Sequence, residues 1–164
     1  MDAVTIKLGH RDDAFVVRKA VFMDEQGYEN EFEPLDDHPG CIHVTAHVAG
    51  EVVGCARTFP HAAECAACDD PHSLPSSPFD AAADDETTFV FGRLAVLPAY
   101  RHRGLGGELV GAAECAARDA GARVMKLHAQ EYVRGMYEAL GYVQIAEVDY
   151  EDEGQPHVWM AKRL

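Results

Sequence analysis

The hydrophobic pattern of the first forty residues changes from strand spacing to helix spacing. Residues 3–8 alternate apolar and polar side chains, which predicts a strand. Apolar residues then recur at helical spacing, where Asp12 or Asp13 is placed to cap the helix and Gly27 to end it. Residues 28–40 are acidic and contain prolines, so we expect a loop or a short broken helix there.

The remaining chain supplies most of the predicted strands. Residues 42–58 alternate on both sides of a short turn, which predicts a β-hairpin. Residues 60–87 are rich in alanine, aspartate, proline and serine without a clear period, so we interpret them as an inserted loop. The patterns further along predict strands over 88–97 and 124–129, helices over 104–120 and about 131–140, and strands over about 143–149 and 157–163.

The order of these elements is β, α, loop, β, β, β, α, β, α, β, β. A mixture of parallel and antiparallel strands with few helices favours one layered α/β (α+β) domain over residues 1–164. We therefore predict a single mixed, mostly antiparallel central sheet of about seven strands, flanked by helices on both faces.

The charge of the chain narrows the classes of partner. It carries 28 Asp and Glu against 14 Lys and Arg, a net charge of −14. A surface that binds nucleic acid needs basic residues for the phosphates, so this balance argues against nucleic acid as a partner. Lysines are few, whereas aspartates and alanines are many, and this composition indicates a halophilic protein.

The sequence shows neither a membrane-spanning segment nor a signal peptide. No apolar stretch is long enough to span a membrane, and the N-terminal residues lack the basic and apolar regions of a signal peptide. We therefore expect a cytoplasmic protein with no membrane partner.

The five cysteines are odd in number and scattered, which favours mostly reduced thiols. Cys41, Cys55 and Cys115 fall in predicted strands or a helix and are expected to be small core residues.

The stretch from Phe89 to Gly111 has the most specific pattern, FVFGRLAVLPAYRHRGLGGELVG. Its strand ends at Pro98, because proline cannot donate to a ladder. A glycine-rich turn then leads into a helix, whose first N–H groups are unpaired and whose dipole is positive at this end. Together these features predict an anion site. The turn consists of Arg101, His102, Arg103, Gly104, Leu105, Gly106 and Gly107.

Two common phosphate motifs do not fit this turn. A P-loop would end in Gly-Lys-Ser or Gly-Lys-Thr, which is missing, and a dinucleotide fingerprint would have a third glycine where Leu109 stands. The order Arg-x-x-Gly-x-Gly over 101–106 instead resembles the acetyl-CoA pyrophosphate loop of the GNAT acyltransferase superfamily. The alternative is a surface loop that caps an amphipathic helix. The resemblance further implies that the preceding strand aligns pantetheine and offers a backbone N–H to the oxyanion, through Leu94, Ala95 and Val96.

A second pattern in the C-terminal half also resembles this superfamily. Gln130 ends a predicted strand, and Tyr137 stands four residues before Gly141, which closes the next helix. The resemblance implies that Gln130 lies against the pantetheine arm and that Tyr137 is the general acid that protonates the departing thiolate. The alternative for Tyr137 is a core aromatic whose hydroxyl is bonded nearby.

The N-terminal half and the C-terminus resemble small prokaryotic GNAT proteins of undefined substrate. Glu25, Glu31 and His157 are candidates to hold or deprotonate an amine. The alternatives are solvated carboxylates, expected for most of residues 29–37, and an exposed or backbone-bonded imidazole at His157. The resemblance rests on Arg18, Val21 to Met23, Glu25, Gln26, Glu31, Glu33, Asp36, Asp37, His43 and the run from Gly154 to Met160.

The inserted loop contains the one pattern that suggests a metal. Two histidines flank a Cys-x-x-Cys pair, and such a set could hold zinc. The histidine spacing is tighter than usual and no second pair supports it, so we expect no metal and an acidic loop with free thiols. The four residues are His61, Cys65, Cys68 and His72.

The resemblance implies an enzyme that moves an acetyl group from acetyl-CoA to an amine by direct attack in a ternary complex. The acceptor could be a small-molecule amine, a protein N-terminus or a lysine, and a homodimer is left open. One alternative is a non-catalytic acyl-CoA-binding module of the same fold. Another is a nucleotide-binding or phosphate-binding protein of a different fold.

The charge balance predicts an effect of salt on stability. Self-repulsion of a net charge of −14 should destabilise the fold in dilute buffer, and screening by molar potassium chloride should raise the melting temperature. Thermal melts from dilute to molar potassium chloride measure this effect. A melting temperature that stays flat over this range would contradict the halophilic interpretation.

Overall fold

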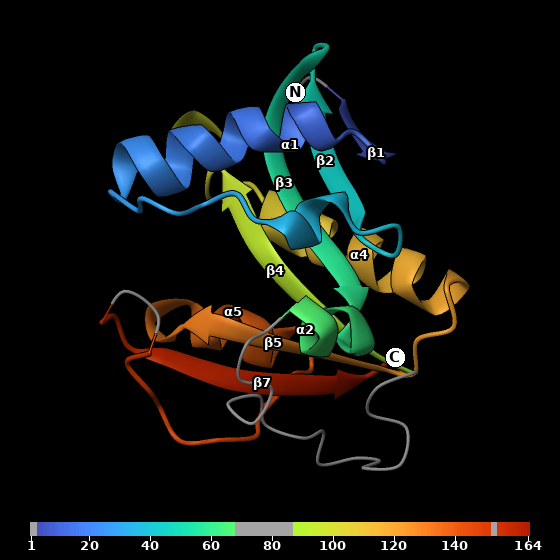
Figure 1. The fold of residues 1–164 in the computed structure, drawn as a ribbon. Helices are drawn as coiled ribbons and strands as arrows, with labels where there is room; N and C mark the ends of the chain where they lie inside the picture. The colour runs from blue at the N-terminus through green and yellow to red at the C-terminus, as the bar shows by residue number, and fades with distance from the viewer. Residues whose placement is uncertain (1–2, 68–86, 152–153) are drawn as a thin grey trace. The chain divides into compact units, whose positions relative to one another are not determined.

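The computed structural model describes residues 3–67, 87–151 and 154–164, which form one seven-stranded mixed sheet (Figure 1). The order of strands across the sheet is β1-β2-β3-β4-β5-β7-β6. The pairs β1–β2, β2–β3, β5–β7 and β6–β7 are antiparallel, whereas β4–β5 is parallel. This confirms the predicted mixed, mostly antiparallel sheet. The strands are β1 (Val4–Leu8), β2 (Ile42–Val48), β3 (Glu51–Pro60), β4 (Thr88–Val96), β5 (Val124–Gln130), β6 (Val143–Gln144) and β7 (His157–Arg163).

Helical segments connect these strands. The first is an α-helix that continues as a π-helix until Gly27, whose φ of +80° is rarely adopted by other residues and ends the helix as predicted. The segments are α1 (Arg11–Arg18), η1 (Lys19–Glu25), η2 (Pro34–Asp37), α2 (His61–Ala67), η5 (Pro98–Tyr100), α4 (Leu105–Asp119), η6 (Glu131–Val133) and α5 (Arg134–Ala139). None of the helices in the described ranges combines the length and apolar character that crossing a membrane requires.

Three sequence predictions about element boundaries were wrong. His10, not Asp12 or Asp13, is the N-cap of α1; the two aspartates lie in its first turn, where their charges favour the positive end of the helix dipole. The predicted loop over 60–87 begins with helix α2, because its alanines favour a helix when no tight turn interrupts them. The predicted strand over 143–149 pairs over only two residues, followed by one isolated bridge at Asp149.

The chain is organised as two compact units. The first contains Met1–Thr58 and Arg93–Ala116, and the second contains Phe59–Gly92 and Ala117–Leu164. Strands β3 and β4 and helix α4 each begin in one unit and end in the other.

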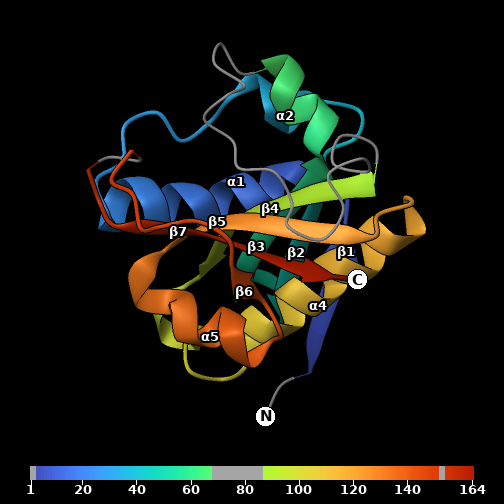
Figure 2. The ribbon, with the colours of Figure 1, turned by 90° about the horizontal axis from the view of Figure 1, so that it is seen from below.

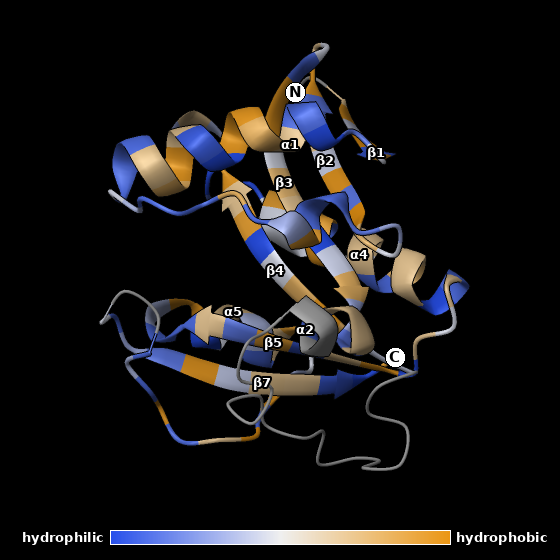
Figure 3. Ribbon diagram, in the orientation of Figure 1, coloured by the Kyte–Doolittle hydropathy of each residue, from blue (hydrophilic) through white to orange (hydrophobic). Residues whose placement is uncertain are grey.

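In the first unit, the strands are covered on both faces. Helix α1 and the π-helix place Val17 and Val21 against Cys55 of β3, and Figure 3 shows the matching alternation of apolar and polar segments along the helix. On the neighbouring residue of β3, a Cβ at Gly54 would lie 3.0 Å from Leu109 of α4. Neighbouring strand residues face opposite sides, so α1 and α4 cover opposite faces of these strands (Figures 1 and 2).

In the second unit, β5 lies between β4 and β7, and α5 packs on one face of these strands. Phe91 of β4 is paired in register with Leu127 of β5 and contacts the ring of Tyr137 in α5. His128 is the next residue along β5, so its side chain lies on the opposite face from Leu127.

Candidate functional site

Strand β4 contains a left-handed residue immediately before the predicted pantetheine segment. Arg93 has a φ of +53°, a left-handed conformation that costs a residue with a side chain about 1–2 kcal/mol. Such strain persists where the surroundings hold the residue in place. Here the Arg93 guanidinium lies 3.0 Å from the Glu31 carboxylate and 3.5 Å from that of Glu33. The strand continues with Leu94 and Val96 half-buried and Ala95 buried.

The glycine-rich turn joins this strand to α4 as the sequence predicts. Gly104 has a φ of +83° and His102 a φ of +60°, so the turn uses two left-handed residues before the helix begins. His102, Arg103 and Gly104 are exposed, whereas Leu105 is buried and anchors the helix start in the core. The first amide groups of α4 have no partner inside the helix, so the turn presents backbone donors beside a positive dipole end.

Arg101 and Glu25, two predicted site residues that are far apart in the sequence, meet in the structure. The two terminal nitrogens of Arg101 donate to the two carboxylate oxygens of Glu25 at 2.8 and 2.6 Å, and Nε donates to the Val96 carbonyl at 2.9 Å. The hydrogen bonds from Arg101 lower the pKa of Glu25. A carboxyl group held ionised in this way is a poor proton acceptor at neutral pH.

Three other predicted site residues lie in the second unit: Tyr137, Gln130 and His157. Tyr137 is buried, with its ring edge-to-face against Phe91 and Tyr142 at 6.3 and 5.7 Å between centroids. Burial raises the pKa of Tyr137, which keeps the hydroxyl protonated at neutral pH. Gln130 ends β5 and is paired in register with His157. His157 is buried, and its Nδ1 lies 2.9 Å from the Gln155 carbonyl, so the backbone-bonded alternative describes its environment.

Glu31 and Asp36 form part of a buried ion network that the sequence analysis missed. Arg18 donates from Nε to Glu31 at 2.7 Å, and to the two carboxylate oxygens of Asp36 at 2.5 and 3.0 Å. Phe15 and Phe32 stack on each other, and the Arg18 guanidinium lies 4.9 and 5.3 Å from their ring centroids. The expectation of solvated carboxylates was therefore wrong for these two acids.

Arg57 of β3 completes the network from the other side. It donates to Asp36 at 2.6 Å and forms a short ion pair with Glu33. Burial alone would raise the pKa of Asp36, but the hydrogen bonds and charges of Arg18 and Arg57 outweigh it and hold this pKa well below its usual range. One sequence signal pointed to the network: Arg18 stands four residues after the buried Ala14, on the apolar face of its helix.

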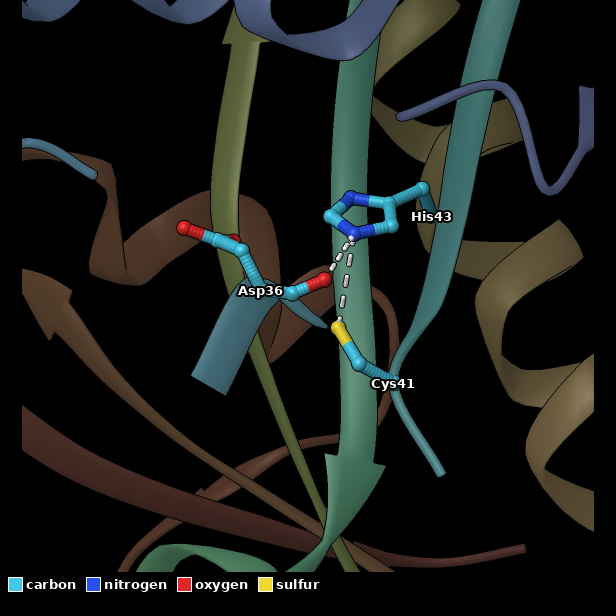
Figure 4. Close-up of side chains that lie close together, drawn as sticks. All are labelled: Asp36, Cys41 and His43. Carbon is cyan, nitrogen blue, oxygen red and sulfur yellow. Dashed lines mark hydrogen bonds between the residues drawn. The ribbon is translucent and has the colours of Figure 1, made fainter. Parts of the chain in front are cut away.

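Asp36, Cys41 and His43 lie close enough together to suggest a metal site (Figure 4). Their bonding does not fit a cation. His43 Nε2 donates to the Asp36 carbonyl at 2.9 Å, and the Asp36 carboxylate is already bonded to two guanidinium groups. Burial raises the pKa of Cys41 to about 11, so its thiol is protonated at neutral pH. A metal would need the thiolate and would face two arginines.

The cysteine and zinc predictions have mixed outcomes. Cys55 is buried as predicted, Cys41 is half-buried, and Cys115 is exposed, because it lies on the outer side of α4. Of the four residues of the suggested zinc set, Cys68 and His72 lie outside the described residues, and His61 is buried at the start of α2. The zinc alternative therefore stays untested.

Comparison with known proteins identifies the family. Residues 10–142 match the model of the acetyltransferase (GNAT) family. The chain belongs to the GNAT family. A Bacillus subtilis (strain 168) protein described as a candidate acetyltransferase is 33% identical over 155 residues, covering 92% of this chain and 87% of that protein.

Solved structures agree with this GNAT assignment. A candidate N-acetyltransferase from Lactobacillus plantarum has a TM-score of 0.76 at 26% identity, with 99% of both chains covered. An aminoglycoside 6′-N-acetyltransferase complexed with coenzyme A has a TM-score of 0.68 at 17% identity, covering 97% of this chain and 96% of that chain, and this likeness concerns the fold alone. This GNAT protein is an N-acetyltransferase, which confirms the predicted family and enzyme class.

The buried network makes a prediction about stability. Arg18→Met leaves Glu31 and Asp36 without their shared cation and should cost about 3–5 kcal/mol in the free energy of unfolding, measured by urea titration at pH 7. The matched control is Arg11→Met on the same helix, whose ion pairs are exposed and should contribute no more than about 1 kcal/mol.

The same network predicts the direction of the pH effect. The pKa of Asp36 is depressed in the folded state, so its contribution to stability is present above the unfolded pKa and is lost as the pH falls through the folded pKa. Arg18→Met should therefore flatten the loss of stability on acidification below about pH 4. Equal costs for the two methionine variants at pH 7 would show that the network is not stabilising.

Proposed function

We propose that this GNAT protein transfers an acetyl group from acetyl-CoA to an amine by direct attack in a ternary complex. One arrangement carries the proposal. Strand β4 is followed by a turn that contains the left-handed Gly104, and this turn leads directly into the start of helix α4. The family assignment supports acyl transfer to an acceptor such as an amine and the use of an acyl-CoA.

The turn is proposed to hold the pyrophosphate of acetyl-CoA through backbone N–H groups of residues 101–107. A left-handed Gly104 and the exposure of the turn support close approach by an anion. Arg103 adds a positive charge on the same turn, with its guanidinium 5.3 Å from the Tyr100 ring centroid. Arg101 is hydrogen-bonded to Val96 and Glu25, so we assign it the role of fixing the turn. Glu25 would in turn position Arg101.

The segment from Leu94 to Val96 is proposed to align pantetheine and to offer one backbone N–H to the oxyanion of the tetrahedral intermediate. Arg93, immediately before this segment, has a left-handed backbone conformation, so the chain departs from regular strand geometry where the segment begins. Gln130 is assigned an amide contact with pantetheine, from the resemblance of its pattern.

Tyr137 is proposed to protonate the CoA thiolate as the carbon–sulfur bond breaks. The hydroxyl of Tyr137 carries its proton at neutral pH, as a general acid must before reaction, but burial raises its pKa and makes it a weaker acid, so the assignment comes from the resemblance of its pattern. The alternative function, a non-catalytic acyl-CoA-binding module, would use the same turn but would release no CoA.

Cofactor binding is tested with Gly106→Val. A side chain at this position should block close approach to the backbone and abolish acetyl-CoA binding, measured by calorimetry. The matched control is Gly111→Val, farther along α4, where an added Cβ would meet nothing within 4 Å. Gly104 is unsuitable for this test, because its φ of +83° would strain any side chain.

A thermal melt complements the calorimetry. Acetyl-CoA at 100 times its Kd should stabilise the wild type by about 2.7 kcal/mol, whereas ATP and NAD should not. Unchanged affinity of a folded Gly106→Val variant would refute the assignment of the turn.

The acid is tested with Tyr137→Phe, which keeps the ring and removes only the hydroxyl. We expect kcat to fall by about 10²–10⁴-fold while acetyl-CoA binding barely changes. Release of free thiol from CoA measures turnover with an acceptor found by screening amines. Tyr142→Phe, which removes the hydroxyl of the neighbouring buried ring, is the control and should retain activity. Full turnover by Tyr137→Phe would make Tyr137 a packing residue.

A further inference from the structure

His128 and Asp149 form a histidine–carboxylate pair in the second unit. His128 lies on β5, and its Nε2 is 2.8 and 3.1 Å from the two carboxylate oxygens of Asp149. Their side chains keep 19% and 22% of their surface exposed, so the pair is mostly buried but still in contact with solvent. Sequence reasoning gave neither residue a role, because they are 21 positions apart and the bridge between Asp149 and His157 forms in the folded sheet.

The pair defines the tautomer of the imidazole. A carboxylate only accepts hydrogen bonds, so Nε2 of a neutral His128 carries the hydrogen and Nδ1 carries the lone pair. Aromatic neighbours also restrict the orientation of the His128 ring. Its centroid lies 4.6 Å from that of Trp159, on which it stacks, and 4.9 Å from that of His157. A neutral imidazole with a defined lone pair and a carboxylate behind it is the usual arrangement of a general base.

We propose that His128 is the general base that removes a proton from the ammonium form of the amine acceptor, and that Asp149 positions it; this inference rests on the proposed function. The class of acceptor that needs such a base is a primary amine that is protonated at neutral pH. His128 Nδ1 takes one proton from the ammonium group. The freed nitrogen lone pair then attacks the thioester carbon.

The remaining protons balance as follows. The tetrahedral intermediate collapses with breakage of the carbon–sulfur bond, and Tyr137 protonates the thiolate. The proton that the amide nitrogen loses restores the Tyr137 hydroxyl, and the proton on His128 leaves to solvent. The products are the amide, CoA thiol and one released proton.

The other candidate bases are less suited to this step: Glu31 is buried and already accepts a hydrogen bond from Arg18. Glu25 is held ionised by Arg101, and the hydrogen bonds from Arg101 lower its pKa. His157 is buried and has its Nδ1 at the Gln155 carbonyl. His128 combines partial exposure with a carboxylate partner.

The acid and the base also lie on opposite faces of the second unit's strands. Tyr137 packs on Phe91, which is in register with Leu127, whereas His128 points to the other face. Among the described residues, the titratable groups near His128 are Asp149, His157 and, on its own strand, Lys126, whose amine is 5.8 Å from the Trp159 ring. In the tetrahedral intermediate the amine nitrogen and the sulfur are bonded to one carbon, so His128 and Tyr137 have to reach it from opposite faces of the strands, where the β4–β5 pairing ends at Phe91 and Leu127.

The test compares two amines that differ in basicity. Ethylamine is protonated at pH 7, whereas 2,2,2-trifluoroethylamine is already neutral and needs no base. His128→Gln should lower CoA release with ethylamine by about 10²-fold and change the rate with the fluorinated amine by only a few-fold. With ethylamine, the rate of this variant should keep rising with pH until the free amine itself is deprotonated. Asp149→Asn should give a smaller loss with the same selectivity, because it disturbs only the orientation of His128.

Controls separate this inference from folding and from the proposed function. His10→Gln removes another histidine that lies near an aspartate, at 3.3 Å and exposed, and should retain full activity. Acetyl-CoA should stabilise all variants equally. Equal losses with both amines, or no loss, would overturn the role of His128. Wild-type protein that binds acetyl-CoA but releases no CoA with either amine would overturn the proposed acetyl transfer and this inference with it.

Discussion

A buried charge must be paired, and the first unit is organised around this constraint. Arg18 is almost fully buried, and the carboxylates of Glu31 and Asp36 compensate its charge in the packed helix. Arg57 binds the same Asp36 carboxylate from β3. Helix, acidic segment and strand are thereby fixed to one another by side chains whose separation would leave uncompensated charges in an apolar environment.

The network also reaches the strand that leads to the proposed cofactor turn. Glu31, already bonded to Arg18, lies 3.0 Å from the guanidinium of Arg93, the residue with left-handed backbone in β4. The same strained residue precedes the backbone segment to which we assign pantetheine and the oxyanion. A second ion pair, between Arg101 and Glu25, ties the end of the π-helix to the turn itself. Two arginine pairs thus hold in place the backbone that would have to be preorganised for catalysis.

In the second unit, strand alternation has the corresponding role. Consecutive residues Leu127 and His128 of β5 face opposite sides, one toward the packing of α5 and the other toward the imidazole, indole and carboxylate cluster. One strand therefore supports both the buried tyrosine and the mostly buried histidine–carboxylate pair, and a shift of register by one residue would exchange the two faces.

The sequence by itself determined the elements and the turn. Alternation, helical spacing, Pro98 and the glycines act within a few residues, so they predicted the seven strands, α4 and the turn at 101–107. The tertiary structure decided which charges are buried and which partners they have. Arg18 and Glu31 are 13 positions apart and Arg101 and Glu25 are 76 apart, and no local pattern relates them. An acidic segment therefore resembles solvated surface in the sequence, because only long-range packing determines whether an arginine meets each carboxylate or water does.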